Sequence, residues 1–183
     1  MNAAWAHFED TVFMLLFSVL GSVNMGAKEA VRNELDFKPV CAILKSTAII
    51  DPRLPARDHI LQLVAWTERP LREDRNRFVH DPIYFGGSDV GYEQYHFVTR
   101  KKKPQSFKPE RVTTLSYRSL TKPIIDRFTE AVRKAEHYAG WINHHLSDEP
   151  EDFRALPEVE AVAEELRAAI ASYIALTKSA GAK

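Results

Sequence analysis

The sequence predicts a mainly helical, all-α protein: a bundle of four to six helices with a β-hairpin inserted at about residues 83–115. Over most of the chain, apolar residues recur at steps of three and four, which is the spacing of a helix with one buried face. One mid-chain stretch differs, because aromatic and β-branched residues flank Gly86-Gly87, as in a β-hairpin. With 183 residues, 45% of them hydrophobic, the chain is long enough for a single domain, residues 1–183, with its own core.

The first helix is expected over residues 4–24 as a buried core helix, with Gly21 and Gly26 marking its end or a break. Its hydrophobic stretch, Val12 to Leu20, is shorter than the ~20 residues that span a bilayer. Glu9 and Asp10 precede that run, where a secretory signal would carry positive charge. We therefore expect a cytoplasmic protein with no membrane segment.

Further helices are expected, and prolines mark several of their boundaries. Pro39 suits the first turn of a helix, whereas Pro70 lies inside a helical pattern and should kink or divide it. Pro82 disfavours helix at Asp81, so the segment that contains Pro70 should end at about His80. The expected ranges are 27–35, 39–48, 56–78, 121–146 and 157–177, the first being either a short separate helix or a continuation of the first helix.

Composition and charge narrow the classes of function. Lys plus Arg and Asp plus Glu both number 25, and this balance disfavours coating nucleic acid by bulk charge but leaves room for a local basic patch. Cys41 is the only cysteine, so no intrachain disulfide forms, and its apolar neighbours predict a buried thiol. No phosphate-binding glycine loop is present and the histidines of the 121–146 helix lack metal-site spacing, so we expect no cofactor and no metal. The core is expected to hold the three tryptophans, Trp5, Trp66 and Trp141.

A candidate functional motif closes the 56–78 segment: Arg75-Asn76-Arg77-Phe78-Val79-His80. It fits the pattern of Arg, then Asn, Asp or His, then three residues, then His. With this motif near the end of a mid-chain helix and a strongly apolar first helix, the chain resembles the HEPN superfamily. These are all-α nucleotide-binding domains related to toxin and antiviral ribonucleases. The resemblance covers about Trp5 to Leu146 and makes residues 81–116 an insertion after the motif helix.

The resemblance implies a metal-independent endoribonuclease or an RNA-binding protein of a bacterial defence or stress system. In catalytic members the motif's Arg and His face each other across a homodimer, which implies that Arg75 and His80 are catalytic here and that Asn76 supports them. Glu9 is a further candidate, because such domains often place a polar residue on the first helix. RNA and a second copy of the chain are therefore the expected partners.

The chemistry of the motif agrees with that reading. A helix C-terminus stabilises the charged form of a histidine, so His80 could supply a proton as a general acid. An arginine can clamp a phosphate through two donors at once. On a regular helix Asn76 and His80 share a face, whereas Arg75 lies about 140° away from His80. A site built from Arg75 and His80 therefore needs a distorted turn or a second subunit.

Three basic residues are candidates for contact with RNA phosphates: Arg77, Lys101 and Lys102. For the two lysines the alternative is a solvated loop. The motif has a structural alternative too: Arg75 pairs with a neighbouring carboxylate, Glu73, Asp74 or Asp81, and His80 caps the helix end. The alternative function for the whole chain is a non-catalytic helical interaction module that binds a protein partner.

Overall fold

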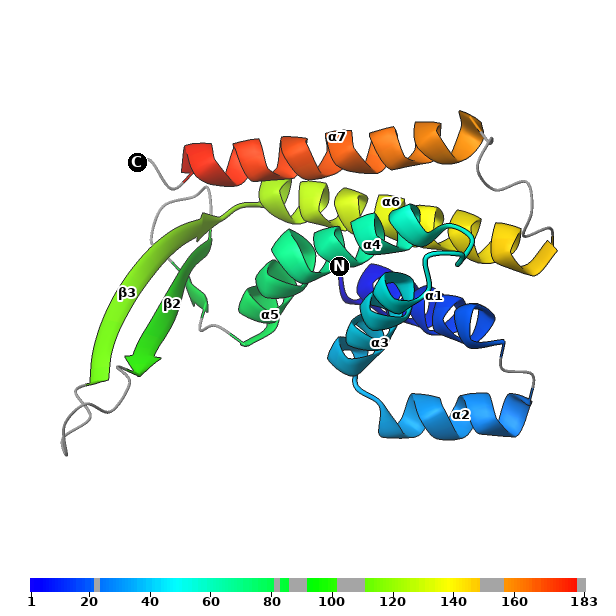
Figure 1. Cartoon of the computed structure of the whole chain (residues 1–183). Coiled ribbons are helices and arrows are strands. Elements are labelled where there is room, and N and C mark those ends of the chain that lie inside the picture. The colour runs from blue at the N-terminus through cyan, green and yellow to red at the C-terminus, as the bar shows by residue number, and fades with distance from the viewer. Residues whose placement is uncertain (22–23, 81–82, 86–91, 102–110, 149–156, 181–183) are drawn as a thin grey trace.

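The computed structural model describes residues 1–21, 24–80, 83–85, 92–101, 111–148 and 157–180. Within these ranges the chain forms a helical bundle with an inserted antiparallel sheet, which confirms the predicted fold class (Figure 1). The helices are α1 (Asn2–Leu20), α2 (Met25–Glu34), α3 (Phe37–Ile50), α4 (Arg57–Trp66), the π-helical η1 (Thr67–Arg72), α5 (Glu73–His80), α6 (Lys122–Asp148) and α7 (Pro157–Ala180). The strands are β1 (Ile83–Phe85), β2 (Tyr92–Lys101) and β3 (Arg111–Leu120).

Helix α1 is a core helix, as its apolar periodicity predicts. By length and composition alone it could cross a membrane, but one face of it is buried against α3 and α6. It ends at Gly21, whose φ of 63° lies in the left-handed region that favours glycine. The core residues it contributes are Ala4, Trp5, Phe8, Val12, Phe13, Leu15, Leu16 and Phe17.

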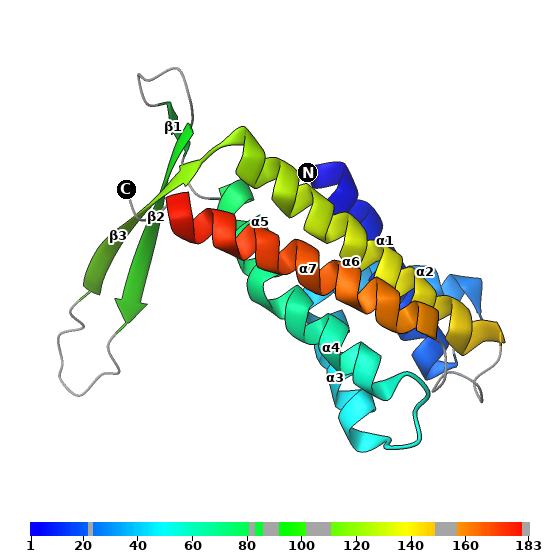
Figure 2. The ribbon, with the colours of Figure 1, turned by 90° about the horizontal axis from the view of Figure 1, so that it is seen from above.

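Helix α6 is the central element of the bundle, because α1 and α7 both pack along it (Figure 2). Phe128 and Tyr138 of α6 are fully buried, as is Tyr173 of α7. The rings of Phe128 and Tyr173 meet edge to face, with centroids 5.5 Å apart. Of the three tryptophans, Trp5 is buried in this core, whereas Trp66 and Trp141 lie partly exposed at its edge.

The segment from α4 to α5 is interrupted where the sequence predicts it. Arg69, next to Pro70, has non-helical dihedral angles (φ −144°, ψ 125°), because proline restricts the residue before it. The chain then continues as α5, and this helix ends at His80, in agreement with the expected boundary. The break turns α5 so that Phe78 is buried and meets Phe128 edge to face, with centroids 5.0 Å apart.

The inserted sheet has the strand order β1-β2-β3, antiparallel throughout. The β2–β3 ladder runs from Tyr92 opposite Leu120 to Lys101 opposite Arg111, so the sheet extends beyond the predicted end at residue 115. It projects from one end of the bundle beside α5, while α2 lies towards the opposite end (Figure 1). The insertion therefore leaves the bundle core intact and stands next to the candidate motif.

Candidate functional site

Helix α5, which carries the motif, is held from two sides. The Tyr173 hydroxyl of α7 donates a hydrogen bond to Oδ2 of Asp74, 2.7 Å away. The Arg69 guanidinium pairs with the Glu73 carboxylate at 2.8 Å. Together with the burial of Phe78, these contacts hold the helix that carries Arg75.

Arg75 lies over the aromatic ring of a residue from α1. Its guanidinium carbon is 5.9 Å from the centroid of the Trp5 ring, a cation–π contact. Its Nη1 also donates to Oδ1 of Asn76 at 3.3 Å. Trp5 is 3% exposed and its indole Nε1 donates to Oε1 of Glu9, 2.5 Å away. We call these four residues, Arg75, Asn76, Trp5 and Glu9, the Arg75 cluster.

Within the described residues, no carboxylate forms an ion pair with the guanidinium of Arg75. Of the nearby acids described, Glu73 and Asp74 have the partners given above and Glu9 accepts from the Trp5 indole, whereas Asp81 lies outside the described residues. Arg75 is half-buried, so part of its charge faces solvent and can meet an anion.

Three charged side chains act on the buried thiol of Cys41, and one of them, Glu9, belongs to the Arg75 cluster. Burial raises the pKa of Cys41 to about 12; the positive charge of Arg72 opposes this rise, and the carboxylates of Glu68 and Glu9 add to it. These effects require the three charges to lie near Cys41. Lys45 of α3 pairs with Glu68 at 3.3 Å. Residues from α1, α3, η1 and α5 therefore converge on one part of the molecule.

The structure brings together two of the predicted site residues. Arg75 and Asn76 are in contact. Arg77 and His80 have their backbone in α5, but their side chains lie outside the described part of the structure. Lys101 is the last residue of β2, also without a described side chain, and Lys102 lies outside the described residues.

Sequence reasoning placed Trp5 in the core but missed its role under Arg75. The available signal was the spacing of Trp5 and Glu9, which is one helical turn, so both face the same side of the helix. The contact with Arg75 joins residues 70 positions apart, and no local pattern encodes it.

A second polar network lies at the start of α4. The Tyr138 hydroxyl and Nδ1 of His59 are 2.6 Å apart, and Gln62 accepts from the same hydroxyl at 3.3 Å. Burial lowers the pKa of His59. His59 and Gln62 line a cavity of about 680 Å³ that Glu160 of α7 also borders. This network connects α4, α6 and α7, and its evident role is structural.

Comparisons with known proteins identify no family for this chain. The chain matches no family model, and it matches no curated protein and no solved structure. No group of three or more histidine, cysteine or acidic side chains that could hold a metal occurs among residues 1–21, 24–80, 83–85, 92–101, 111–148 and 157–180. The geometry of the Arg75 cluster is therefore the main basis for a functional argument.

Proposed function

We propose that this chain is a HEPN-like RNA-binding protein that cleaves RNA without a metal ion, using Arg75 and His80. The observation that carries the proposal is the half-buried guanidinium of Arg75, held on Trp5 and not ion-paired with any described side chain. A cation that is oriented before its ligand arrives loses little conformational entropy on binding a phosphate. The position of His80 at the end of α5 supports a second role, that of proton donor.

The reaction would be an attack within the RNA strand. The ribose 2′-hydroxyl loses its proton to solvent water or hydroxide, its oxygen bonds to the adjacent phosphorus, and the bond from phosphorus to the 5′-oxygen of the next nucleotide breaks. Protonated His80 gives its proton to that leaving oxygen, which produces a 2′,3′-cyclic phosphate and a 5′-hydroxyl. Arg75 stabilises the added negative charge on the phosphoryl oxygens, and Asn76 orients the guanidinium through its carbonyl oxygen.

A homodimer is part of the proposal, because Arg75 and His80 do not share a face of α5. On regular geometry they lie about 140° apart around the helix axis. In a two-fold dimer, Arg75 of one protomer can work with His80 of the partner subunit. Val79, between Asn76 and His80, is 42% exposed and offers an apolar side chain to such an interface.

The test is cleavage of single-stranded RNAs of varied sequence in excess EDTA. Arg75→Ala and His80→Ala should each reduce the rate at least about a hundredfold, because each removes a group that acts in the transition state. Arg75→Lys should restore little, since an ammonium group lacks the planar, two-donor geometry. Arg53→Ala, an exposed arginine in the α3–α4 loop, is the matched control and should leave the rate unchanged.

A mixture of the two inactive variants tests the shared site. If each site takes Arg75 from one subunit and His80 from the other, random mixing of Arg75→Ala and His80→Ala protomers restores about a quarter of wild-type activity, as two-fold symmetry requires. If both residues act within one protomer, the mixture stays inactive. A wild-type protein that binds a partner but cleaves none of the RNAs would contradict the proposal and favour the non-catalytic interaction module.

A further inference from the structure

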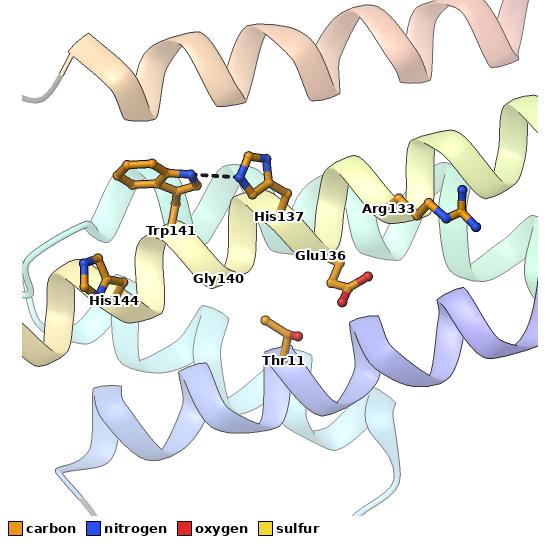
Figure 3. Close-up of a pocket in the computed structure, with 7 residues that line it drawn as sticks. All are labelled: Thr11, Arg133, Glu136, His137, Gly140, Trp141 and His144. Carbon is orange, nitrogen blue, oxygen red and sulfur yellow. Dashed lines mark hydrogen bonds between the residues drawn. The ribbon is translucent and has the colours of Figure 1, made fainter.

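Arg72, the last residue of η1, is a second half-buried arginine that has no counter-ion among the described residues. Its guanidinium forms no ion pair and no hydrogen bond with any of them. Arg53 and Arg133 are likewise without an ion pair among these residues, but both are exposed, so water solvates their charges. Arg133 borders the groove of about 480 Å³ between α1 and α6 that Figure 3 shows. Partial burial removes some of that hydration, so a missing counter-ion costs more free energy at Arg72 than at these exposed positions.

The carboxylates nearest to Arg72 in the sequence are engaged by other groups. Glu68 is paired with a lysine of α3, 3.3 Å away, and Glu73 with an arginine of η1, 2.8 Å away. Asp74 accepts a hydrogen bond from a tyrosine hydroxyl of α7 at 2.7 Å. The charge of Arg72 is therefore available to an anion from outside the chain, like that of Arg75.

Arg72 and Arg75 are neighbours on one helical surface. The backbone at Glu73, between them, is helical (φ −60°, ψ −46°), and residues three apart on a helix have Cβ atoms about 5–6 Å apart. Like charges at this spacing repel each other. The segment cannot turn away to relieve the repulsion, because Leu71 before it and Phe78 after it are buried in the core. An anion bound to both side chains would offset it.

The two arginines also face the same neighbouring helices. Arg75 lies over the ring of Trp5 on α1, and the centroid of that ring is 5.5 Å from that of Phe37 on α3. Cys41 follows Phe37 by one helical turn. Burial raises the pKa of the Cys41 thiol and the positive charge of Arg72 opposes that rise, which places Arg72 near α3. Both guanidinium groups therefore lie where the η1–α5 segment meets α1 and α3.

Arg72 is central to the helix surface that carries the proposed site. Arg75, Asn76 and Val79 follow it at three, four and seven positions, which is the spacing of one helix face. Asn76 and Val79 are exposed, so this face is open to solvent. Around the axis of a regular helix, position 72 lies about 60° from position 75 and about 80° from position 80, between the two. A strand that crosses this face meets Arg72 beside Arg75.

We propose that Arg72 and Arg75 together bind two consecutive phosphates of a single RNA strand, with Arg75 at the scissile phosphate and Arg72 at its neighbour. A guanidinium holds a phosphate through two donors at once. Two phosphates supply the two negative charges that this pair of cations lacks among the described residues, and they remove the repulsion between the arginines. The inference deepens the proposed function and rests on it for the choice of RNA as the ligand.

The experiment measures binding to an RNA that cannot be cleaved. The probe is a fluorescein-labelled 2′-O-methyl oligouridine, which lacks the attacking hydroxyl, and fluorescence anisotropy gives its affinity at several salt concentrations. Arg72→Gln and Arg75→Gln should each weaken binding at least about tenfold, because each removes charge-assisted hydrogen bonds to a phosphate. Each should also lower the slope of log affinity against log salt by about 0.7, the value for one phosphate of a single strand.

Two further variants separate contact with phosphate from other roles of an arginine. Arg72→Lys keeps the charge but not the planar pair of donors, so it should keep the salt slope and recover part of the affinity. Arg133→Gln is the matched control, since it removes an exposed arginine that also lacks an ion pair among the described residues, and it should change neither quantity.

Thermal unfolding distinguishes binding from a structural role. The melting temperature of Arg72→Gln should equal or exceed that of the wild type, because glutamine keeps much of the side chain and the repulsion with Arg75 disappears. A lower melting temperature together with an unchanged salt slope would show that Arg72 serves the fold, and this result overturns the inference.

The outcome for Arg72 is separable from the outcome for cleavage. With a cleavable RNA, Arg72→Gln should raise KM about tenfold and leave kcat within about twofold, because Arg72 holds a phosphate that does not react. A wild type that binds the 2′-O-methyl strand through both arginines but cleaves no RNA contradicts the cleavage activity and supports this inference. Cleavage by the wild type with an unchanged affinity and salt slope in Arg72→Gln overturns this inference alone. Absence of binding to the strand also overturns it.

Discussion

Removal of one hydroxyl should loosen the helix that carries the motif. In Tyr173→Phe the ring stays in the core against Phe128, but the hydrogen bond from the hydroxyl to Oδ2 of Asp74 is lost. Asp74 lies in the first turn of α5, directly before Arg75. The substitution therefore tests whether α7 holds α5 in place through this contact.

The magnitude follows from the kind of bond and its exposure. A hydrogen bond to a charged group contributes about 1.5–3 kcal/mol to stability. Asp74 is half-buried, so water can replace part of what the carboxylate loses, and we expect a loss of about 1–2 kcal/mol. For a chain of this length each kcal/mol lowers the melting temperature by about 2–4 °C, which gives a shift of about 2–8 °C.

The assay is urea unfolding of the wild type, Tyr173→Phe, Asp74→Ala and the double variant, with the m-value checked for constancy. The two substitutions should be non-additive by about 0.5 kcal/mol or more, because they remove the same bond. Thr177→Val is the matched control: its hydroxyl donates within α7, to the carbonyl of Ile174, and should not couple to Asp74. Additive effects of Tyr173→Phe and Asp74→Ala would refute the reasoning.

Four other predictions follow from the burial of single side chains or from the space around them. Because burial lowers the pKa of His59, the unfolded chain takes up this proton more readily than the folded one, so the free energy of unfolding should fall as the pH drops below about 6.5. Urea titrations from pH 7.5 to 5 should show a flatter profile for His59→Gln than for the wild type. Phe128→Ala should cost about 3–5 kcal/mol by calorimetry, since the ring is fully buried; a loss under about 2 kcal/mol would contradict the described packing. Gly140→Ala should stabilise the chain by about 0.5–1 kcal/mol in the same calorimetry, because alanine favours the helix and its Cβ would meet Cγ2 of Thr11 at an ordinary 4.0 Å; a destabilised variant would show that the space beside Gly140 is tighter than described. Cys41, buried and with its pKa raised to about 12, should resist iodoacetamide at pH 8 until urea unfolds the protein, and rapid labelling of the folded chain would show that the thiol is exposed.

Much of the fold follows from local patterns in the sequence. The spacing of apolar residues locates the helices to within a few residues, because each helix must bury one face whatever its neighbours are. Pro70 predicts the interruption before α5, and α5 ends at His80 as expected. The sheet was underestimated, since β3 continues to Leu120 in a ladder that depends on its partner strand. Trp141, expected in the core, lies at its edge.

The sequence by itself determined that a helix would carry Arg75 and Asn76 and end at His80, because helix boundaries depend on nearby residues. Only the tertiary structure decided what those residues meet. Arg75 rests on Trp5 of α1 and pairs with neither Glu73 nor Asp74, whose carboxylates are engaged by Arg69 and Tyr173. Contacts between residues far apart in the chain come from the packing of whole helices, which no short segment specifies.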